Sequence, residues 1–91
     1  MLNHYMNRYG LEINTKNVGG GLRLIYPWGI TVNADAVIGS NVTLFKGVTI
    51  GVIERGSKQG NPSIGDNVTI YANATVCGNI KIGNNSIIAS N

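Results

Sequence analysis

Residues 61–91 read NPSIGDNVTIYANATVCGNIKIGNNSIIASN, and this stretch decides the fold. An aliphatic side chain recurs in it at every sixth position, at Ile64, Ile70, Val76, Ile82 and Ile88. Three places after each comes an asparagine, at Asn67, Asn73, Asn79, Asn85 and Asn91. Because asparagine tolerates a positive φ, this second slot predicts a tight corner. A period of six matches neither the helical 3.6 nor the strand period of two. It predicts a short strand and a turn, repeated and stacked as a parallel β-helix with the aliphatic column inside.

The same pattern extends toward the N-terminus. The aliphatic slot there holds Val32, Ile38, Leu44 and Ile50 and, less regularly, Val18 and Leu24. The corner slot holds Gly21, Asp35, Asn41 and Gly47. The residue four places after each aliphatic is predicted to point inward as well, which gives Leu22, Trp28, Ala36, Val42, Val48, Val68, Ala74, Ile80 and Ser86. We interpret residues 30–31 as a two-residue insertion between hexads, and residues 51–63, which break the period, as a protruding loop.

The repeats predict an all-β domain over residues 13–91, with about three to four coils, preceded by a cap segment over residues 1–12. So thin a stack exposes two strand edges, and exposed edges favour association. We therefore expect a homo-oligomer, or capping by residues 1–10 as a short helix or an irregular segment. Crossovers between parallel strands are nearly always right-handed, so this rule by itself predicts a right-handed coil.

Length and composition exclude several classes of function. The 91 residues suffice for one small domain. The net charge of +3 is spread along the chain, whereas nucleic-acid binding needs clustered basic residues. No apolar run is long enough for a membrane span, and the first residues lack the apolar core of a secretion signal, so we expect a cytoplasmic protein. The single cysteine, Cys77, forms no internal disulfide and by itself no zinc site, and no metal site is predicted.

Three segments carry a family resemblance: EINTKNVGGGLRL (12–24), GITVNADAVIGSNVTLFKGVTIG (29–51) and the stretch 61–91. Together they resemble the hexapeptide-repeat acyltransferases, in particular the serine acetyltransferase branch and its relatives that O-acetylate polysaccharide sugars. GVTIG, a loop, a proline and IGDNV form the part of the pattern specific to that branch. The resemblance implies a left-handed β-helix, a homotrimer, and acetyl-CoA as acyl donor in the groove between subunits. It also implies direct attack on the thioester by a hydroxyl of a sugar, a polysaccharide precursor or serine.

The resemblance assigns catalytic positions too. The family's histidine base, which takes the proton of the acceptor hydroxyl, corresponds to Tyr26, and the acidic residue that orients it corresponds to Glu12. A second family histidine corresponds to Asn61. A base works best when its pKa lies near the working pH, which suits imidazole; a tyrosine, with a usual pKa of about 10, needs a nearby cation. Two interpretations stay open: Tyr26 acts in catalysis, or it packs at a subunit interface.

For the donor, the resemblance assigns Gly51, Val52, Ala72 and Ser90 to positions that contact the pantetheine arm. Lys58, in the loop, is a candidate partner for the phosphates, and is equally consistent with a solvated lysine. Because both family histidines are replaced, an alternative function remains open. In that alternative, the chain is a catalytically degenerate β-helix that is non-catalytic or depends on a partner subunit.

Overall fold

A computed structural model describes residues 4–6, 12–14 and 17–90, the first two ranges by their backbone alone. In these ranges the chain forms strands of two or three residues separated by corners. In chain order they are β1 (His4–Met6), β2 (Glu12–Asn14), β3 (Arg23–Ile25), β4 (Thr31–Val32), β5 (Val37–Ile38), β6 (Thr43–Phe45), β7 (Thr49–Gly51), β8 (Ser63–Ile64), β9 (Thr69–Ile70), β10 (Thr75–Cys77), β11 (Lys81–Ile82) and β12 (Ile87–Ile88).

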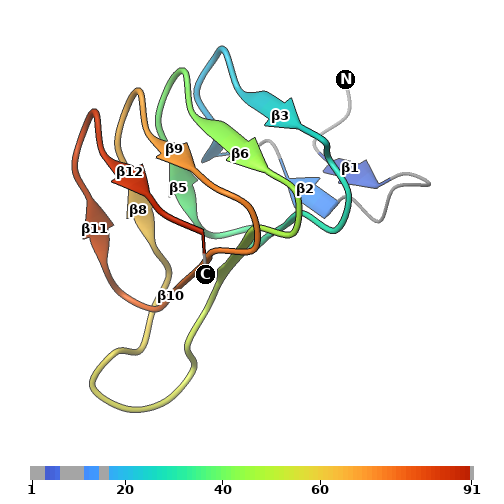
Figure 1. The fold of residues 1–91 in the computed structure, drawn as a ribbon. Helices are drawn as coiled ribbons and strands as arrows, with labels where there is room; N and C mark the ends of the chain where they lie inside the picture. The colour runs from blue at the N-terminus through green and yellow to red at the C-terminus, as the bar shows by residue number, and fades with distance from the viewer. Residues whose placement is uncertain (1–3, 7–11, 15–16, 91) are drawn as a thin grey trace.

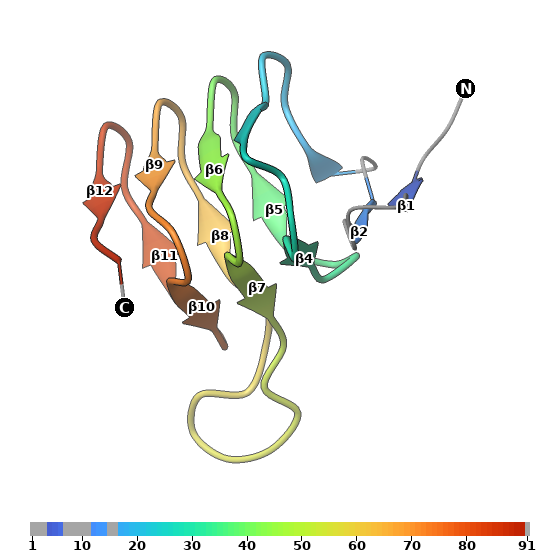
Figure 2. The same ribbon diagram turned by 45° about the vertical axis from the view of Figure 1, so that its right-hand side comes forward.

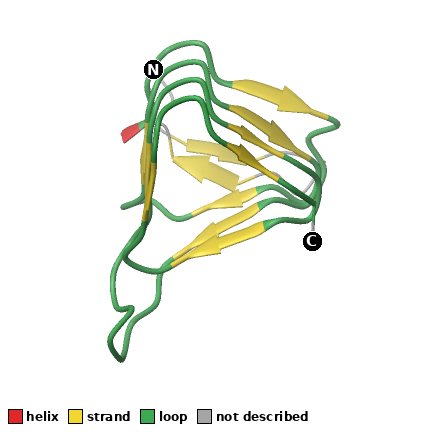
Figure 3. Ribbon diagram, turned by 60° about the vertical axis from the view of Figure 1, so that its left-hand side comes forward, coloured by secondary structure: helices red, strands yellow, loops and turns green. Residues whose placement is uncertain are grey.

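These strands stack into three sheets (Figures 1 and 2). Strands β2, β4, β7 and β10 pair in parallel as sheet A, β5, β8 and β11 as sheet B, and β3, β6, β9 and β12 as sheet C. Successive strands visit the sheets in turn, so the three sheets form the sides of a triangular prism, seen nearly end-on in Figure 3. The chain is a left-handed parallel β-helix, as the family resemblance implied.

The right-handed coil expected from the crossover rule is therefore wrong. That rule reflects the right-handed twist of a strand that feeds a helix packed on the sheet. Here the strands have two or three residues and accumulate little twist. A corner and another short strand stand in place of the crossover helix, so the physical basis of the rule is missing.

The predicted aliphatic slot forms the core. In sheet A Val32 pairs with Ile50 and Ile50 with Val76, and equivalent columns run through sheets B and C. The buried core consists of Ile30, Val32, Ala36, Ile38, Val42, Leu44, Val48, Ile50, Ile64, Val68, Ile70, Ala74 and Val76. Ile82 and Ile88 pack against it and are half-buried, because they belong to the last described coil and are covered from one side. The predicted inner column is thus confirmed.

The corner slot is confirmed at most positions. The backbone has a positive φ at Gly21, Asn41, Gly47, Asn67, Asn73 and Asn85. At one corner the positive φ lies at Gly78 and not at the predicted Asn79, because the adjacent glycine adopts it without a Cβ penalty. Asp35 also differs. Its N–H donates to Oδ1 of Asn33 (3.0 Å), so an Asx turn replaces the left-handed residue.

The two-residue insertion lies earlier than predicted. Five residues separate Ile25 from Thr31, whereas three separate their partners Phe45 and Thr49 on the next coil. The peptide after the insertion is back in register, because Thr31 donates its N–H to the Val48 carbonyl (3.0 Å). The extra residues are therefore 26–27 and not 30–31.

This shift also corrects the predicted orientation of Trp28. Its side chain is 51% exposed and does not point inward. Ile30, placed by the prediction in the insertion, is fully buried in the core instead.

The loop and the N-terminal segment leave the regular stack. β7 ends at Gly51 and β8 begins at Ser63, so the predicted protruding loop is confirmed over residues 52–62 (Figure 1). Ile53 and Gly60 exchange two backbone hydrogen bonds (3.1 and 2.8 Å) and narrow its base. At the N-terminus, His4–Met6 form β1, which pairs antiparallel with β2, so this part is neither a helix nor irregular. Residues 1–3 and 7–11 lie outside the described ranges.

Asn67→Ala tests the corner slot. Asn67 has φ 58°, and a residue with a Cβ but no polar side chain loses about 1 kcal/mol there, while Asn67→Gly is expected to be neutral or slightly stabilising. Urea unfolding measures both variants. Asn79→Ala is the matched control, because the positive φ at that corner lies on Gly78. Equal losses for Asn67→Ala and Asn79→Ala would contradict the role given to φ.

Candidate functional site

The inserted residues form a small bulge between sheets C and A. β3 ends at Ile25, and Tyr26 takes a φ of 51°, which is uncommon for an aromatic residue. Trp28 donates its N–H to the Tyr26 carbonyl (2.7 Å) across Pro27, closing a three-residue turn. Gly29 then lies against Gly47 of the next coil: a Cβ added at Gly29 would be 3.8 Å from the Gly47 Cα. The bulge carries both aromatic side chains outward, and Tyr26 is 66% exposed.

A hollow of about 540 Å³ lies at this corner, lined by Tyr26, Trp28 and Lys46. The two rings lie roughly parallel, with centroids 6.5 Å apart and an interplanar angle of 24°. Lys46 follows β6 on the next coil, and its neighbour Gly47 donates its N–H to the Trp28 carbonyl (2.8 Å). Coil stacking thus brings the lysine beside rings that lie about twenty residues earlier. The hollow combines two aromatic side chains with one cation.

The aromatic surface continues along the same end of sheet C. Phe45, the register partner of Ile25, packs against Tyr71 with ring centroids 4.9 Å apart. Tyr71 directly follows β9 and remains 39% exposed. Four aromatic side chains from three coils therefore lie at or beside one corner of the prism.

The other two catalytic candidates are placed differently. Asn61 lies at the end of the protruding loop, between sheets A and B, so one chain does not bring it to the corner of Tyr26. Its residue is half-buried, and its Oδ1 is buried without a hydrogen-bond partner. Glu12 is the first residue of β2, where its backbone pairs with Thr31, but its side chain lies outside the described part.

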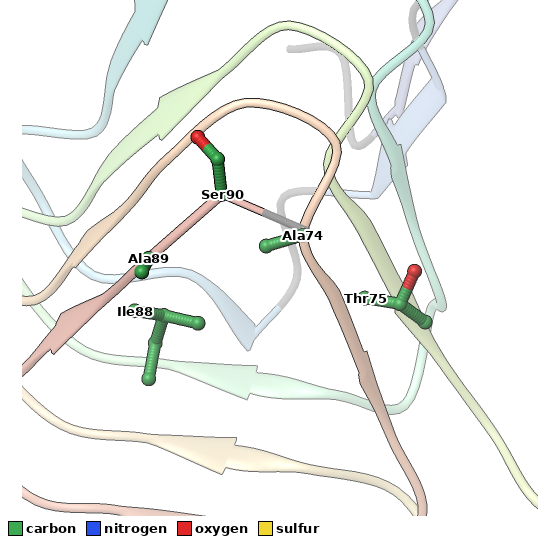
Figure 4. Close-up of a pocket in the computed structure, with 5 residues that line it drawn as sticks. All are labelled: Ala74, Thr75, Ile88, Ala89 and Ser90. Carbon is green, nitrogen blue, oxygen red and sulfur yellow. The ribbon is translucent and has the colours of Figure 1, made fainter.

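The candidate donor residues divide between the same two corners. Gly51, Val52 and Lys58 lie at the end of β7 and in the loop that follows it. Ala72 and Ser90 lie between sheets C and A. Figure 4 shows Ser90 at a hollow of about 250 Å³, which Ala74, Thr75, Ile88 and Ala89 also line. The candidate residues of a single chain therefore lie at two different corners of the prism.

Sequence reasoning missed Trp28 and Lys46 as site residues. Trp28 was assigned to the interior because its spacing fits the inward slot when the insertion is placed at residues 30–31. Lys46 has no sequence signal of its own. The Tyr-Pro-Trp run at 26–28 was the available clue, because a proline and two large aromatics do not fit inside a narrow coil.

Comparison with known proteins supports the resemblance found in the sequence. The family model described as "Bacterial transferase hexapeptide (six repeats)" matches residues 61–91. This match places the last coils of the domain with the hexapeptide repeats of bacterial transferases. The chain is 40% identical over 83 residues to a serine acetyltransferase of Staphylococcus aureus (strain Mu50 / ATCC 700699), covering 90% of the chain and 39% of the relative. It is 37% identical over 83 residues to a serine acetyltransferase of Staphylococcus epidermidis, with the same coverage.

Solved structures of serine acetyltransferases are similar to this chain as well. It superposes on a serine acetyltransferase of Neisseria gonorrhoeae with a TM-score of 0.75 and 38% identity, over 88% of this chain and 31% of that one. The same enzyme in complex with serine gives 0.70 and 36%, over 89% and 36%. The chain thus spans well under half the length of the relatives it matches. No helix in the described residues is long and apolar enough to cross a membrane.

Proposed function

We propose that this hexapeptide-repeat chain is the acyl-transfer domain of an acetyl-CoA-dependent O-acetyltransferase. Its acceptor is a hydroxyl of serine, or of a sugar or polysaccharide precursor, and the reaction takes place in the cytoplasm. The observation that carries this proposal is the similarity to serine acetyltransferases, which spans 90% of the chain at 40% identity.

The division of the candidate residues over two corners supports a homotrimer. Tyr26, Ala72 and Ser90 lie at one corner, and Asn61 and Lys58 at or beyond another, with the width of sheet A between them. A second copy that presents its loop corner to the first copy's aromatic corner completes the site. Head-to-tail contacts form a closed ring when the rotation between copies closes, and in the proposed homotrimer it closes after three copies.

The residues present fit an acetyl-CoA donor. The small side chains of Ala74 and Ser90 line the hollow of about 250 Å³, and Ala72 lies at the same corner, which leaves room for a thin flexible chain such as a pantetheine arm. Lys58 is exposed in the loop, where its ammonium group can pair with phosphates. Acetyl-CoA would supply the acetyl group as a thioester. The protein's part is to hold it in line with the acceptor hydroxyl.

We assign to Tyr26 the removal of the proton from the acceptor hydroxyl. The Tyr26 side chain is exposed and lines the same hollow as the cationic Lys46, so a bound acceptor would lie beside both. Asn61 contributes from the partner's loop corner. Its buried Oδ1 has no hydrogen-bond partner within the described chain, and buried acceptors normally have a donor, which the acceptor substrate would supply in this proposal.

Tyr26→Phe tests this assignment. General acid–base groups contribute about 10²–10⁴-fold, so we expect kcat/KM for the acceptor to fall by about 10²-fold or more while the KM for acetyl-CoA stays unchanged. Release of free thiol from acetyl-CoA measures the rate with serine and with simple glycosides. Tyr71→Phe is the control, because it removes a tyrosine hydroxyl from a ring that packs on Phe45. No donor binding by calorimetry, and no transfer to any hydroxyl acceptor, would refute the enzyme proposal.

The replacement of both family histidines favours a second function, a catalytically degenerate β-helix that serves as a non-catalytic or partner-dependent subunit. The double variant Tyr26→His/Asn61→His tests it. If the chain is degenerate, restoring both imidazoles raises acetyl transfer by at least about tenfold over the wild type. A wild type that already matches the double variant would exclude degeneracy. Circular dichroism of both proteins controls for misfolding.

A further inference from the structure

We propose that Trp28 and Tyr26 form a platform for the pyranose ring of a sugar acceptor, and that Lys46 favours a sugar that carries a negative charge. This inference rests on the proposed acyl-transfer function and selects between its two acceptor classes. It also makes Trp28 a residue that contacts the substrate. The family resemblance assigns no catalytic role to this position.

The exposure of the two rings opposes stability. Burying a large aromatic side chain contributes about 2–3 kcal/mol, yet Tyr26 and Trp28 are 66% and 51% exposed. Tyr26 also takes φ 51°, which costs about 1–2 kcal/mol for a residue with a Cβ. Strain and exposed apolar surface at one place are characteristic of binding sites. The bulge lifts both rings away from the core, which Ile30 completes without them.

The shape and chemistry of the hollow select the ligand. Its volume of about 540 Å³ lies in the usual range for small-molecule sites, roughly 300–1,000 Å³. The faces of aromatic rings carry partial negative charge, so they attract the slightly positive C–H face of a pyranose while its hydroxyls remain in water. Serine has no apolar face of that size and would contact little of the exposed ring surface. A sugar ring therefore fits this surface better than an amino acid does.

Lys46 adds a charge preference. It lines the hollow with Tyr26 and Trp28, and none of these three side chains is negatively charged. Because the lysine is solvent-exposed, its attraction for an anion is moderate and is screened by salt. A carboxylate on the ring, as in a hexuronate, is the matching substituent.

The sequence offers a direct probe, because Trp28 is its single tryptophan. Methyl glucuronide, methyl glucoside and serine are titrated into the intact protein while its tryptophan emission is followed. We expect a saturable change with both glycosides, a several-fold lower Kd for the glucuronide, and no change with serine. The advantage of the glucuronide is expected to disappear in 0.5 M salt and in Lys46→Gln.

Variants complete the test. Their glycoside affinity is measured by ligand-observed NMR, because fluorescence is lost when the single tryptophan is replaced. Trp28→Ala is expected to weaken glycoside binding at least tenfold, while Trp28→Phe keeps it within a few-fold. Ile87→Ala is the control, because Ile87 is 68% exposed on β12, at the far end of the stack from the bulge. Light scattering records the oligomeric state of each variant.

The outcomes separate this inference from the proposed function. Glycoside binding without acetyl transfer overturns the function and leaves the platform standing. Acetyl transfer to serine without glycoside binding overturns the platform alone. The platform is also overturned if Trp28→Ala dissociates the oligomer without changing glycoside affinity, because the rings then belong to an interface with a second copy.

Discussion

Ile70→Ala is expected to lower the free energy of unfolding by about 2–5 kcal/mol. Ile70 is fully buried, and its β9 backbone lies between β6 and β12, where Ile70 pairs with Leu44 and Ile88. Removing its side chain leaves a cavity in a column that is one residue wide, and coils held at strand spacing cannot collapse to fill it. Urea unfolding followed by circular dichroism measures the loss.

The same substitution at a neighbouring position provides the control. Ile87→Ala deletes the same atoms from the residue before Ile88, but Ile87 is 68% exposed on the outer face of sheet C. Its effect is expected to stay within about 0.5 kcal/mol. Comparable losses for the two variants would mean that inside and outside have been assigned to the wrong residues of the hexad.

Gly39→Ala is expected to cost about 2 kcal/mol or more, for a reason unrelated to φ. A Cβ at Gly39 would lie 2.7 Å from the carbonyl carbon and oxygen of Gly65 and still closer to Oδ1 of Asp66. The backbone is held in place, because the Gly39 N–H donates to the Ile64 carbonyl (2.8 Å). The Asp66 carboxylate cannot move away freely either, since it accepts the Ser40 N–H (2.8 Å). The methyl group therefore forces two coils apart.

Gly20→Ala is the matched control, because a Cβ at Gly20 has nothing within 4 Å and its φ lies outside the positive region. We expect this variant to be neutral or slightly stabilised through the entropy of the unfolded chain. Thermal unfolding of both variants compares them directly. A Gly39→Ala protein as stable as the wild type would show that the coils at this corner are less closely packed than described.

The core could be predicted from the sequence because each hexad repeats the same local structure. Ile64, Ile70 and Val76 are buried as the six-residue period predicts, and Asn67 and Asn73 take the positive φ predicted from their spacing. Each of these features depends on one residue type at one place in the repeat. A misplaced insertion therefore changes the predicted positions only up to the next hexad, and the hexads that follow are still assigned correctly.

The bulge could not be predicted in the same way. Trp28 and Ile30 are both apolar, so two placements of the insertion satisfy the pattern equally well. The choice between them depends on stacking: Thr31 bonds to the Val48 carbonyl of the next coil, which puts Ile30 in the core and leaves Tyr26 and Trp28 outside. A local pattern carries no information about a hydrogen bond to a residue seventeen positions away.

By itself the sequence determined the repeat, the buried column, most of the corners and the protruding loop, because each follows from side chains six residues apart. The tertiary structure decided where the insertion lies, that Lys46 joins Tyr26 and Trp28 in one hollow, and that Tyr26 and Asn61 lie at different corners of the prism. The physical reason is that contacts between coils are set by strand pairing across whole turns of the chain. Which side chains meet at a corner is therefore fixed only once the number of residues in every turn is known.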